Sequence, residues 1–379
     1  MTRHLLVTND FPPKHGGIQS YLWELWRRLP PETTTVLTTA FEGAAAWDEA
    51  QPFRIERVDG RILWPTPRLV RRIDAVAAGA GAEIVVLDPA LPLGLVGARL
   101  RLPYGVILHG AEVTVARRLP GLSIALRHVL RGASIVVAAG GYPAAEGERA
   151  AKRRLPVVNV PPGVDLARFR PLDAAERAHA RVALGLPENG RLVVGVSRLV
   201  PRKGFEVLVR AAARLARDRP DVVVAIAGEG RDRCRLERLA RASGAPVSLL
   251  GPVGDDDLPA LYGAADVFAM LCRDRWWGAE QEGFGIVFLE AAAAGVVQVA
   301  GRSGGSAEAV VDGATGLIVR RPDDTAGVID ALVRLLDDES LRTRMGQAAR
   351  QRVEDHFTYD DLACRLGQAL ESWSRARAR

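Results

Sequence analysis

Two glutamates, Glu282 and Glu290, enclose the sequence Gly-Phe-Gly followed by a short apolar run. The glycines allow backbone N–H groups to approach a ligand without an intervening Cβ. The apolar run predicts a helix from about Gly285, and a helix start favours phosphate because its first N–H groups are unpaired. Glu290 would then lie on the second turn, near a ribose, and Glu282 before the helix, near a hexose. This order predicts a site for ribose, diphosphate and hexose, although an apolar helix with a compensating carboxylate at each end is the structural alternative.

A loop with basic side chains follows the apolar run at 192–196. It carries Arg198 and Lys203, which could supply two positive charges to a diphosphate, Arg as a fork and Lys as a point charge. Lysine is scarce, because only Lys14, Lys152 and Lys203 occur among the 51 basic residues, so its presence here is informative. The alternative is a surface turn with two solvated charges.

Two further groups follow apolar runs. Gly16 and Gly17 stand between the first run and a helical pattern, where their backbone could approach phosphate. His109 follows the run at 105–108 and could bond a sugar hydroxyl, although most histidines outside a site are structural. The Asp255-Asp256-Asp257 sequence could bind a divalent metal, but the helical pattern after it predicts an acidic helix start. We therefore predict no metal site.

Short apolar runs alternate with helical patterns along the whole chain. Near-continuous Val, Ile and Leu strands separated by helices predict parallel sheets covered on both faces. The expected strands form two series, at 5–8, 36–39, 84–87, 105–108, 135–138 and 157–160, and at 192–196, 222–227, 247–250, 267–270, 296–300 and 316–319. Two series predict an α/β fold of two doubly wound domains. Ligands of such sheets bind at the carboxyl ends of the strands, so we expect a shared ligand in a central cleft.

The composition of the chain is that of a globular protein, with 379 residues, 48% hydrophobic and 25% charged. No apolar run approaches the roughly 18 residues needed to span a bilayer, and the N-terminus lacks the apolar segment of a secretory signal, so we expect a cytoplasmic location. Residues 1–176 hold 22 basic and 17 acidic side chains, and a basic half could meet an anionic membrane or nucleic acid. Nucleic acid is not expected as a partner, because no binding motif accompanies the charge.

These segments together resemble the retaining glycosyltransferases of family 4, which have the GT-B fold of two Rossmann-like domains. The resemblance covers nearly the whole chain. Its markers are the E-x7-E spacing, the sequence SRLVPRKG at 197–204 and PPGVD at 161–165. The sequences TNDFPP at 8–13 and GGIQSY at 16–21 are similar to the actinobacterial mannosyltransferases that extend phosphatidylinositol mannosides. With the breaks near residues 161–190, we expect an N-terminal, acceptor-side domain at 1–170, completed by a C-terminal helix at 359–379. A donor-side domain is expected at 171–358.

The resemblance implies an enzyme that uses GDP-mannose and needs neither a metal nor another cofactor. The residues implied in catalysis are His109, Arg198, Lys203 and Glu282. Arg198 and Lys203 would hold the diphosphate, and Glu290 would hold the ribose. The other groups implied in donor binding act largely through their backbone, with Gly16 and Gly17 at the diphosphate, Leu250 and Val253 at the base, and Phe284, Gly285, Ile286 and Val287 beside Glu282 at the hexose. His109 would lie near the 6-hydroxyl, and no side-chain nucleophile is implied.

A lipid acceptor would require a face that docks on the inner surface of the cell membrane. The stretches 62–72 and 117–127 mix basic and apolar residues and could be interfacial amphipathic helices, although packed helices with solvated arginines give the same pattern. Two other functions stay open. The chain could be a family 4 enzyme that uses a UDP-sugar or another nucleotide sugar with a different acceptor. It could also be a protein that binds a nucleotide sugar or a membrane without catalysis. The sequence does not predict the oligomeric state.

Overall fold

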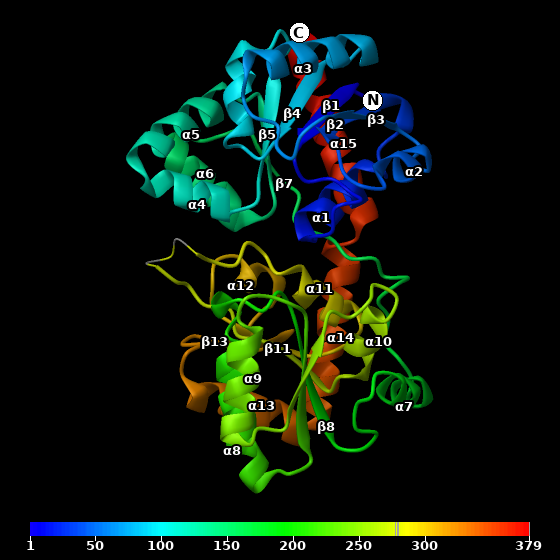
Figure 1. Cartoon of the computed structure of the whole chain (residues 1–379), viewed down its shortest axis with the longest axis vertical. Helices are drawn as coiled ribbons and strands as arrows, with labels where there is room; N and C mark the ends of the chain where they lie inside the picture. Colours follow the sequence, from blue (N-terminus) through cyan, green and yellow to red (C-terminus); the bar gives the residue numbers. More distant parts are fainter. Residues whose placement is uncertain (277, 279, 379) are drawn as a thin grey trace. The chain divides into compact units, whose positions relative to one another are not determined.

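The computed structural model describes residues 1–276, 278 and 280–378, which form two compact units (Figure 1). Unit 1 comprises Met1–Gly163 and Tyr359–Arg379, and unit 2 comprises Val164–Thr358. The division at Gly163 precedes the expected boundary at residue 170. Val164 pairs with Thr358 and Phe169 packs in the core of unit 2, so the segment between them belongs to that unit.

Unit 1 contains a seven-stranded parallel sheet with the order β3-β2-β1-β4-β5-β6-β7. The order reverses between β1 and β4, which is the arrangement of a doubly wound sheet. The strands are β1 (His4–Thr8), β2 (Thr34–Thr39), β3 (Arg54–Val58), β4 (Ile84–Asp88), β5 (Tyr104–Leu108), β6 (Ile135–Ala138) and β7 (Val157–Asn159).

Helices cover both faces of this sheet. On one face, buried side chains come from α3 (Pro67–Ala80), α4 (Ala111–Arg118), α5 (Pro120–Gly132), α6 (Gly141–Ala151) and the 3-10 helix η2 (Leu93–Arg99). On the other face, α1 (Gly17–Trp26) packs beside the C-terminal helix α15 (Tyr359–Ala378) (Figure 1). The short elements η1 (Pro31–Thr33) and α2 (Ala44–Glu49) complete the unit.

Unit 2 contains a six-stranded parallel sheet with the order β10-β9-β8-β11-β12-β13. Its strands are β8 (Arg191–Val196), β9 (Val222–Ala227), β10 (Val247–Gly251), β11 (Val267–Met270), β12 (Gln298–Gly301) and β13 (Gly316–Val319). On one face lie α8 (Phe205–Asp218), α9 (Arg233–Ser243) and α13 (Thr325–Asp337). On the other lie α10 (Leu258–Ala264), α11 (Ile286–Ala293) and the C-terminal half of α14 (Glu339–His356) (Figure 1). The short elements are η3 (Pro201–Lys203) and α12 (Ser306–Ala309), and α7 (Ala174–Ala183) lies beside α10. The predicted fold of two doubly wound α/β domains is confirmed.

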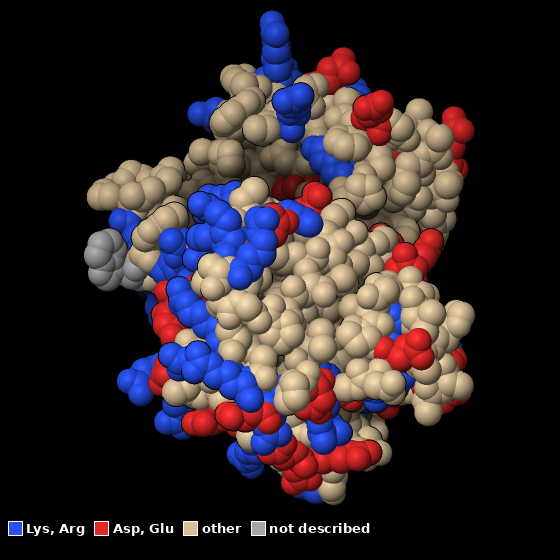
Figure 2. All heavy atoms as spheres, turned by 60° about the horizontal axis from the view of Figure 1, so that its bottom comes forward, with Lys and Arg blue, Asp and Glu red and all other residues tan. Residues whose placement is uncertain are grey.

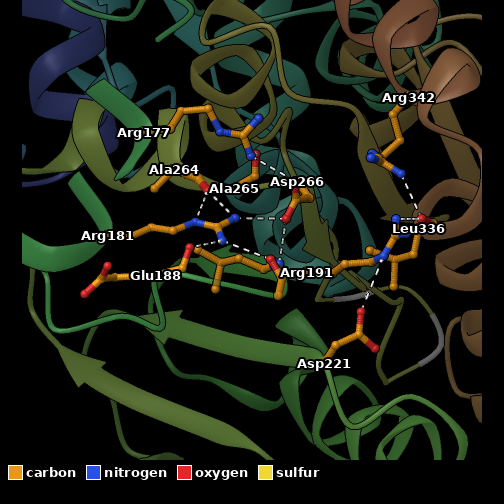
Figure 3. A network of polar contacts seen from close by, with 12 residues as sticks. Arg177, Arg181, Glu188, Arg191, Asp221, Ala264, Ala265, Asp266, Leu336 and Arg342 are labelled. Carbon is orange, nitrogen blue, oxygen red and sulfur yellow. Dashed lines mark hydrogen bonds and ion pairs between the residues drawn. The ribbon is translucent and has the colours of Figure 1, made fainter. Parts of the chain in front are cut away.

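A partly buried ion-pair network anchors α7 to the sheet of unit 2 (Figure 3). Asp266 accepts hydrogen bonds from Arg177 at 2.8 Å and from Arg181 at 2.9 Å. The backbone N–H of Leu192, at the start of β8, donates to the same carboxylate at 2.7 Å. Arg181 also donates to the carbonyl of Ala264, so its guanidinium is well satisfied although it is almost fully buried. One carboxylate thus joins α7, β8 and the segment that enters β11.

Candidate active site

The loop after β8 carries Arg198 and Lys203 and is fixed by the loop after β9. Leu199 donates its N–H to the carbonyl of Glu229 at 2.7 Å, and its own carbonyl accepts from the N–H of Asp232 at 3.0 Å. Within this frame the side chain of Arg198 is exposed, whereas that of Lys203 is buried. Of these two basic groups, Arg198 is therefore presented to solvent and Lys203 is directed into unit 2.

Gly204 allows the loop to approach the end of β11. Its φ is +71°, and a Cβ at this position would lie 2.1 Å from the carbonyl oxygen of Leu271. A side chain would be both strained and blocked by backbone, so only glycine permits this packing. The close approach brings Lys203, which precedes Gly204, beside the segment that runs from Leu271 to Glu282.

Lys203 and Glu282 form a buried ion pair, with 2.7 Å between Nζ and Oε2. The side chains are 7% and 8% exposed, respectively. The Cys272 thiol donates to the same oxygen at 3.2 Å. Burial alone would raise the pKa of Glu282, but the positive charges of Lys203 and Arg202 outweigh it and lower the pKa. Glu282 is therefore a carboxylate at neutral pH, although it is removed from water.

The pair keeps unused hydrogen-bonding capacity. An ammonium has three donors, and Lys203 uses one of them on Glu282. Both hydrogen bonds to the carboxylate of Glu282 reach Oε2, and no described residue donates to Oε1. The pair can thus accept a hydroxyl at Oε1 and donate to an anion from Nζ.

The backbone around Glu282 is held by the ends of β11 and β12. Its N–H donates to Ser303 Oγ at 3.1 Å, and its carbonyl accepts from Gly305 N–H at 2.9 Å. Ser303 Oγ in turn donates to Asp274 Oδ1 at 2.7 Å. Glu282 is therefore positioned through its main chain as well as through Lys203.

Helix α11 begins at Ile286, directly after Gly285, whose φ is +91°. The N–H groups of Ile286 and Val287, in the first turn, have no carbonyl partner within the helix. Phe284 is buried against Phe357, with ring centroids 5.7 Å apart, which fixes the segment before the helix. The predicted helix start is confirmed, and it offers unpaired N–H groups four and five residues after Glu282.

Glu290 lies on the second turn of α11, as predicted. Its Oε2 accepts a hydrogen bond from the Tyr262 hydroxyl at 2.6 Å. Burial raises the pKa of Glu290, and the hydrogen bond from Tyr262 only partly opposes that effect. Leu250 in β10 and Val253 in the loop after it are both half-buried. Unit 2 thus places Arg198, Lys203, Leu250, Val253 and Glu282 at or beyond the carboxyl ends of its strands, with Glu290 on the helix that follows.

The remaining predicted residues, Gly16, Gly17 and His109, belong to unit 1. Gly16 and Gly17 form the exposed start of α1, directly after the β1 loop. His109 follows β5, and its Nε2 lies 2.6 Å from Asp88 Oδ1 at the end of β4. Asp88 also accepts a hydrogen bond from the Thr8 hydroxyl, at the end of β1, at 2.7 Å. The carboxyl ends of three neighbouring strands therefore build the surroundings of His109.

The Asp88 carboxylate sets the charge of His109. Burial would lower the pKa of the imidazole, but the charge and hydrogen bond of Asp88 outweigh burial and raise the pKa to about 9. The ring is therefore protonated at neutral pH. Since the folded-state pKa exceeds the ordinary value of 6.5, this pair stabilises the fold fully below pH 6.5 and loses its effect as the pH rises through about 9.

We expect Asp88→Asn to lower the pKa of His109 from about 9 to its ordinary value of 6.5 or below. The amide removes the negative charge and leaves burial as the dominant influence. An NMR titration of the His109 ring in the wild type and the variant measures this shift. Asp74→Asn is a control that removes another half-buried carboxylate of unit 1, in α3. A His109 pKa above about 8 in Asp88→Asn would contradict the assignment.

Several side chains of these sites were not predicted from the sequence. They are Asp88 beside His109, Tyr262 beside Glu290, and Arg202, Cys272, Asp274 and Ser303 around Glu282. The sequence could have indicated Asp88 as a site residue, because it is a charged residue that directly follows the fully apolar run Ile84–Leu87. The others are polar residues whose role depends on strands that only the fold brings together.

The residues that the structure describes contain no group of three or more His, Cys, Asp or Glu side chains arranged to hold a metal ion. Asp257 directly precedes α10, in agreement with the expected acidic helix start, but its side chain does not cap the helix.

Comparison with known proteins identifies the family. The model of the family described as Glycosyl transferases group 1 matches residues 176–352. Over its full length, the chain is 39% identical to the GDP-mannose-dependent alpha-(1-6)-phosphatidylinositol monomannoside mannosyltransferase of Mycobacterium tuberculosis, and the match covers 100% of both chains. The chain belongs to the group 1 glycosyltransferases. It is also 34% identical to the GDP-mannose-dependent monoacylated alpha-(1-6)-phosphatidylinositol monomannoside mannosyltransferase of Corynebacterium glutamicum, over 98% of each chain.

Solved structures support the fold of this glycosyltransferase. Anabaena HepE in complex with UDP and glucose superposes with a TM-score of 0.80 at 21% identity, over 98% of this chain and 100% of HepE. Sucrose-phosphate synthase from Thermosynechococcus elongatus gives a TM-score of 0.81 at 23% identity, over 99% and 100% of the two chains. At these identities the similarity concerns the fold, and it confirms the predicted GT-B class.

Proposed function

We propose that this glycosyltransferase transfers mannose from GDP-mannose to a hydroxyl of a phosphatidylinositol mannoside-type lipid, with retention of the anomeric configuration. The observation that carries the proposal is the full-length similarity to mannosyltransferases with this donor, at 39% identity. The buried Lys203–Glu282 pair beside the start of α11 agrees with it, because it combines a cation, a carboxylate and unpaired N–H groups.

In the proposed reaction the charges of unit 2 stabilise the leaving diphosphate. Arg198 and Lys203 face the phosphates, and the first N–H groups of α11 add a partial positive charge. Glu282 accepts a hexose hydroxyl at Oε1, and Glu290 accepts ribose hydroxyls at the oxygen not bonded to Tyr262. Leu250 and Val253 border the base.

Unit 1 contributes the remaining proposed contacts. The backbone at Gly16 and Gly17 approaches the diphosphate, and the protonated ring of His109 donates to the 6-hydroxyl of the hexose. The acceptor hydroxyl attacks from the side of the leaving group, and it loses its proton to the departing phosphate oxygen. No protein nucleophile and no metal ion are needed in this scheme, because preformed cationic groups already stabilise the developing negative charge.

A transfer assay tests the proposal. Purified protein is incubated with radiolabelled GDP-mannose and phosphatidylinositol monomannoside, and labelled lipid and GDP are quantified with EDTA present. We expect both products, and at least about tenfold less turnover with UDP-glucose or ADP-glucose. Turnover that favours UDP-glucose or another nucleotide sugar supports the alternative donor. Absence of nucleoside diphosphate release from every donor supports a binding protein without catalysis.

We further propose that unit 1 docks on an anionic membrane surface. Among the described residues, no helix is long and apolar enough to cross a bilayer. Exposed apolar side chains instead gather around the junction of α4 and α5, where Val115, Leu119, Leu122 and Ile124 are between 41% and 67% exposed. Arg117 and Arg118 lie in the same segment. In the other predicted stretch, Ile62 and Trp64 are exposed but lie in the loop before α3, so that part is not helical.

We expect the variant Leu122→Ser with Ile124→Ser to lose at least about 80% of the binding to anionic liposomes at low salt. Each buried CH₂ contributes about 0.8 kcal/mol to such binding, so removing two exposed apolar side chains has a large effect. The matched control is Val182→Ser with Val311→Ser, which removes exposed apolar residues of unit 2. Sedimentation with vesicles measures the bound fraction. Equal loss in both double variants, or no binding by the wild type, would contradict the docking face.

A further inference from the structure

Unit 2 contains a basic cavity beside the Glu282 segment. Its volume is about 780 Å³, and it lies beyond the carboxyl ends of β11, β12 and β13. Its lining includes Arg273 and Asp274 after β11, Arg302 and Ser303 after β12, and Arg320 and Arg321 after β13. None of the residues proposed to bind the donor lines this cavity. On the face of the molecule drawn in Figure 2, basic side chains lie together in groups.

Two of these arginines are forced together by the sheet. Gly301 and Val319 are register partners in the parallel pair β12–β13, so Arg302 and Arg320 follow at adjacent positions. Neighbouring strands lie about 4.8 Å apart, and like charges in such positions repel each other. Both side chains are exposed, and no described residue forms an ion pair or side-chain hydrogen bond with either guanidinium. Their charge is therefore not neutralised within the protein.

The acidic side chains of the cavity are already engaged. Asp274 accepts hydrogen bonds from Ser303 and Gln281, and Asp323 pairs with Arg273. Asp324 accepts from the N–H of Ala326 at the start of α13 and lies 3.6 Å from Arg321. The carboxylates thus hold the segments that line the cavity. The positive charge that is not paired within the described residues comes from Arg302 and Arg320.

We propose that this cavity binds a phosphate group of a second ligand, distinct from the nucleotide sugar. Guanidinium groups match the geometry of phosphate oxygens, and two adjacent forks can hold one phosphate monoester or diester. The bound anion removes the repulsion between the two arginines. The cavity also shares Asp274 and Ser303 with the network that holds the backbone of Glu282, so its occupation bears on the site proposed for the hexose.

Isothermal titration calorimetry with inorganic phosphate tests the cavity without any transfer assay. We expect the dissociation constant to rise at least about tenfold in the variant Arg302→Gln with Arg320→Gln. The matched control is Arg210→Gln with Arg214→Gln, which removes two exposed arginines of α8, and we expect a change of less than about twofold. Arg198→Gln, at the proposed donor site, is expected to leave the phosphate affinity of the cavity equally unchanged.

The proposal is overturned if inorganic phosphate does not bind, or if both double variants weaken it equally. It is also overturned if only Arg198→Gln weakens phosphate binding, because the anion then occupies the donor site. Circular dichroism establishes that each variant is folded. Because these readouts do not involve sugar transfer, they are independent of the failure or success of the proposed function.

Titrations with glycerol phosphate and with phosphatidylinositol vesicles identify the source of the phosphate. Weakened binding of glycerol phosphate in the Arg302 and Arg320 double variant indicates a soluble ligand. A loss seen only with vesicles indicates a lipid headgroup. If the double variant binds both probes as tightly as the wild type, the cavity is not a phosphate site.

Discussion

Replacing Lys203 with Ala lowers the rate of sugar transfer at least about 100-fold, while both units stay folded. In the proposed mechanism the ammonium stabilises the diphosphate as negative charge builds on it, and losing one such preorganised group costs about 2.7–4 kcal/mol of transition-state stabilisation. The structure adds a second reason, because Lys203 is the ion-pair partner of the buried Glu282. Without it, burial dominates and the pKa of Glu282 rises, which weakens the group proposed to hold the hexose.

The control for this prediction separates charge from packing. Glu282→Gln combined with Lys203→Met removes both charges of the pair and leaves no unpaired buried carboxylate. We expect this double variant to be more stable than Lys203→Ala but equally inactive, since a buried pair is not required for stability. Steady-state kinetics and thermal unfolding measure the two effects. Near-normal kcat in Lys203→Ala, or recovered activity in the double variant, would show that the ammonium does not act on the donor.

Asp266→Ala destabilises unit 2 by about 3–5 kcal/mol, which is the usual result of removing one partner from a buried ion pair. The change leaves Arg181 without a counter-charge in a site where its side chain is 8% exposed, and it also removes the acceptor of Leu192 N–H. For a unit of this size, the corresponding fall in the midpoint of thermal unfolding is roughly 6–20 °C. Differential scanning calorimetry measures it.

Asp221→Ala is the matched control, drawn in the same network (Figure 3). Asp221 is 52% exposed and lies 3.6 Å from Arg191, so its ion pair is solvated. Exposed pairs contribute at most about 1 kcal/mol, and we expect a small shift in the midpoint. Comparable shifts for Asp266→Ala and Asp221→Ala would mean that the α7 anchor does not stabilise the unit.

The strands were predictable where burial alone determines their composition. Twelve apolar runs correspond to strands, because a parallel sheet covered on both faces requires almost continuous Val, Ile and Leu. The exception is β3, whose sequence Arg-Ile-Glu-Arg-Val carries three charges. It lies at the edge of the sheet, pairs only with β2 and is half-buried or exposed, so its residues lack the signature of a buried strand.

The site was predictable in its parts but not in its contacts. Lys203 and Glu282 were assigned to different portions of the donor, yet they bond to each other because β8 and β11 are neighbours in the sheet. For the same reason, the contact between His109 and Asp88 could not be predicted from the sequence, because it depends on the adjacency of β4 and β5. Spacing along the chain indicates which residues leave strand ends, but only the strand order indicates which of them meet.

Both Arg198 and Lys203 are proposed to hold the diphosphate of the nucleotide sugar. A crystal structure of the protein with GDP-mannose bound tests this proposal most directly. We expect phosphate oxygens within hydrogen-bond distance of both side chains and of the first N–H groups of α11. A diphosphate bound elsewhere, with Lys203 engaged only by Glu282, would contradict it.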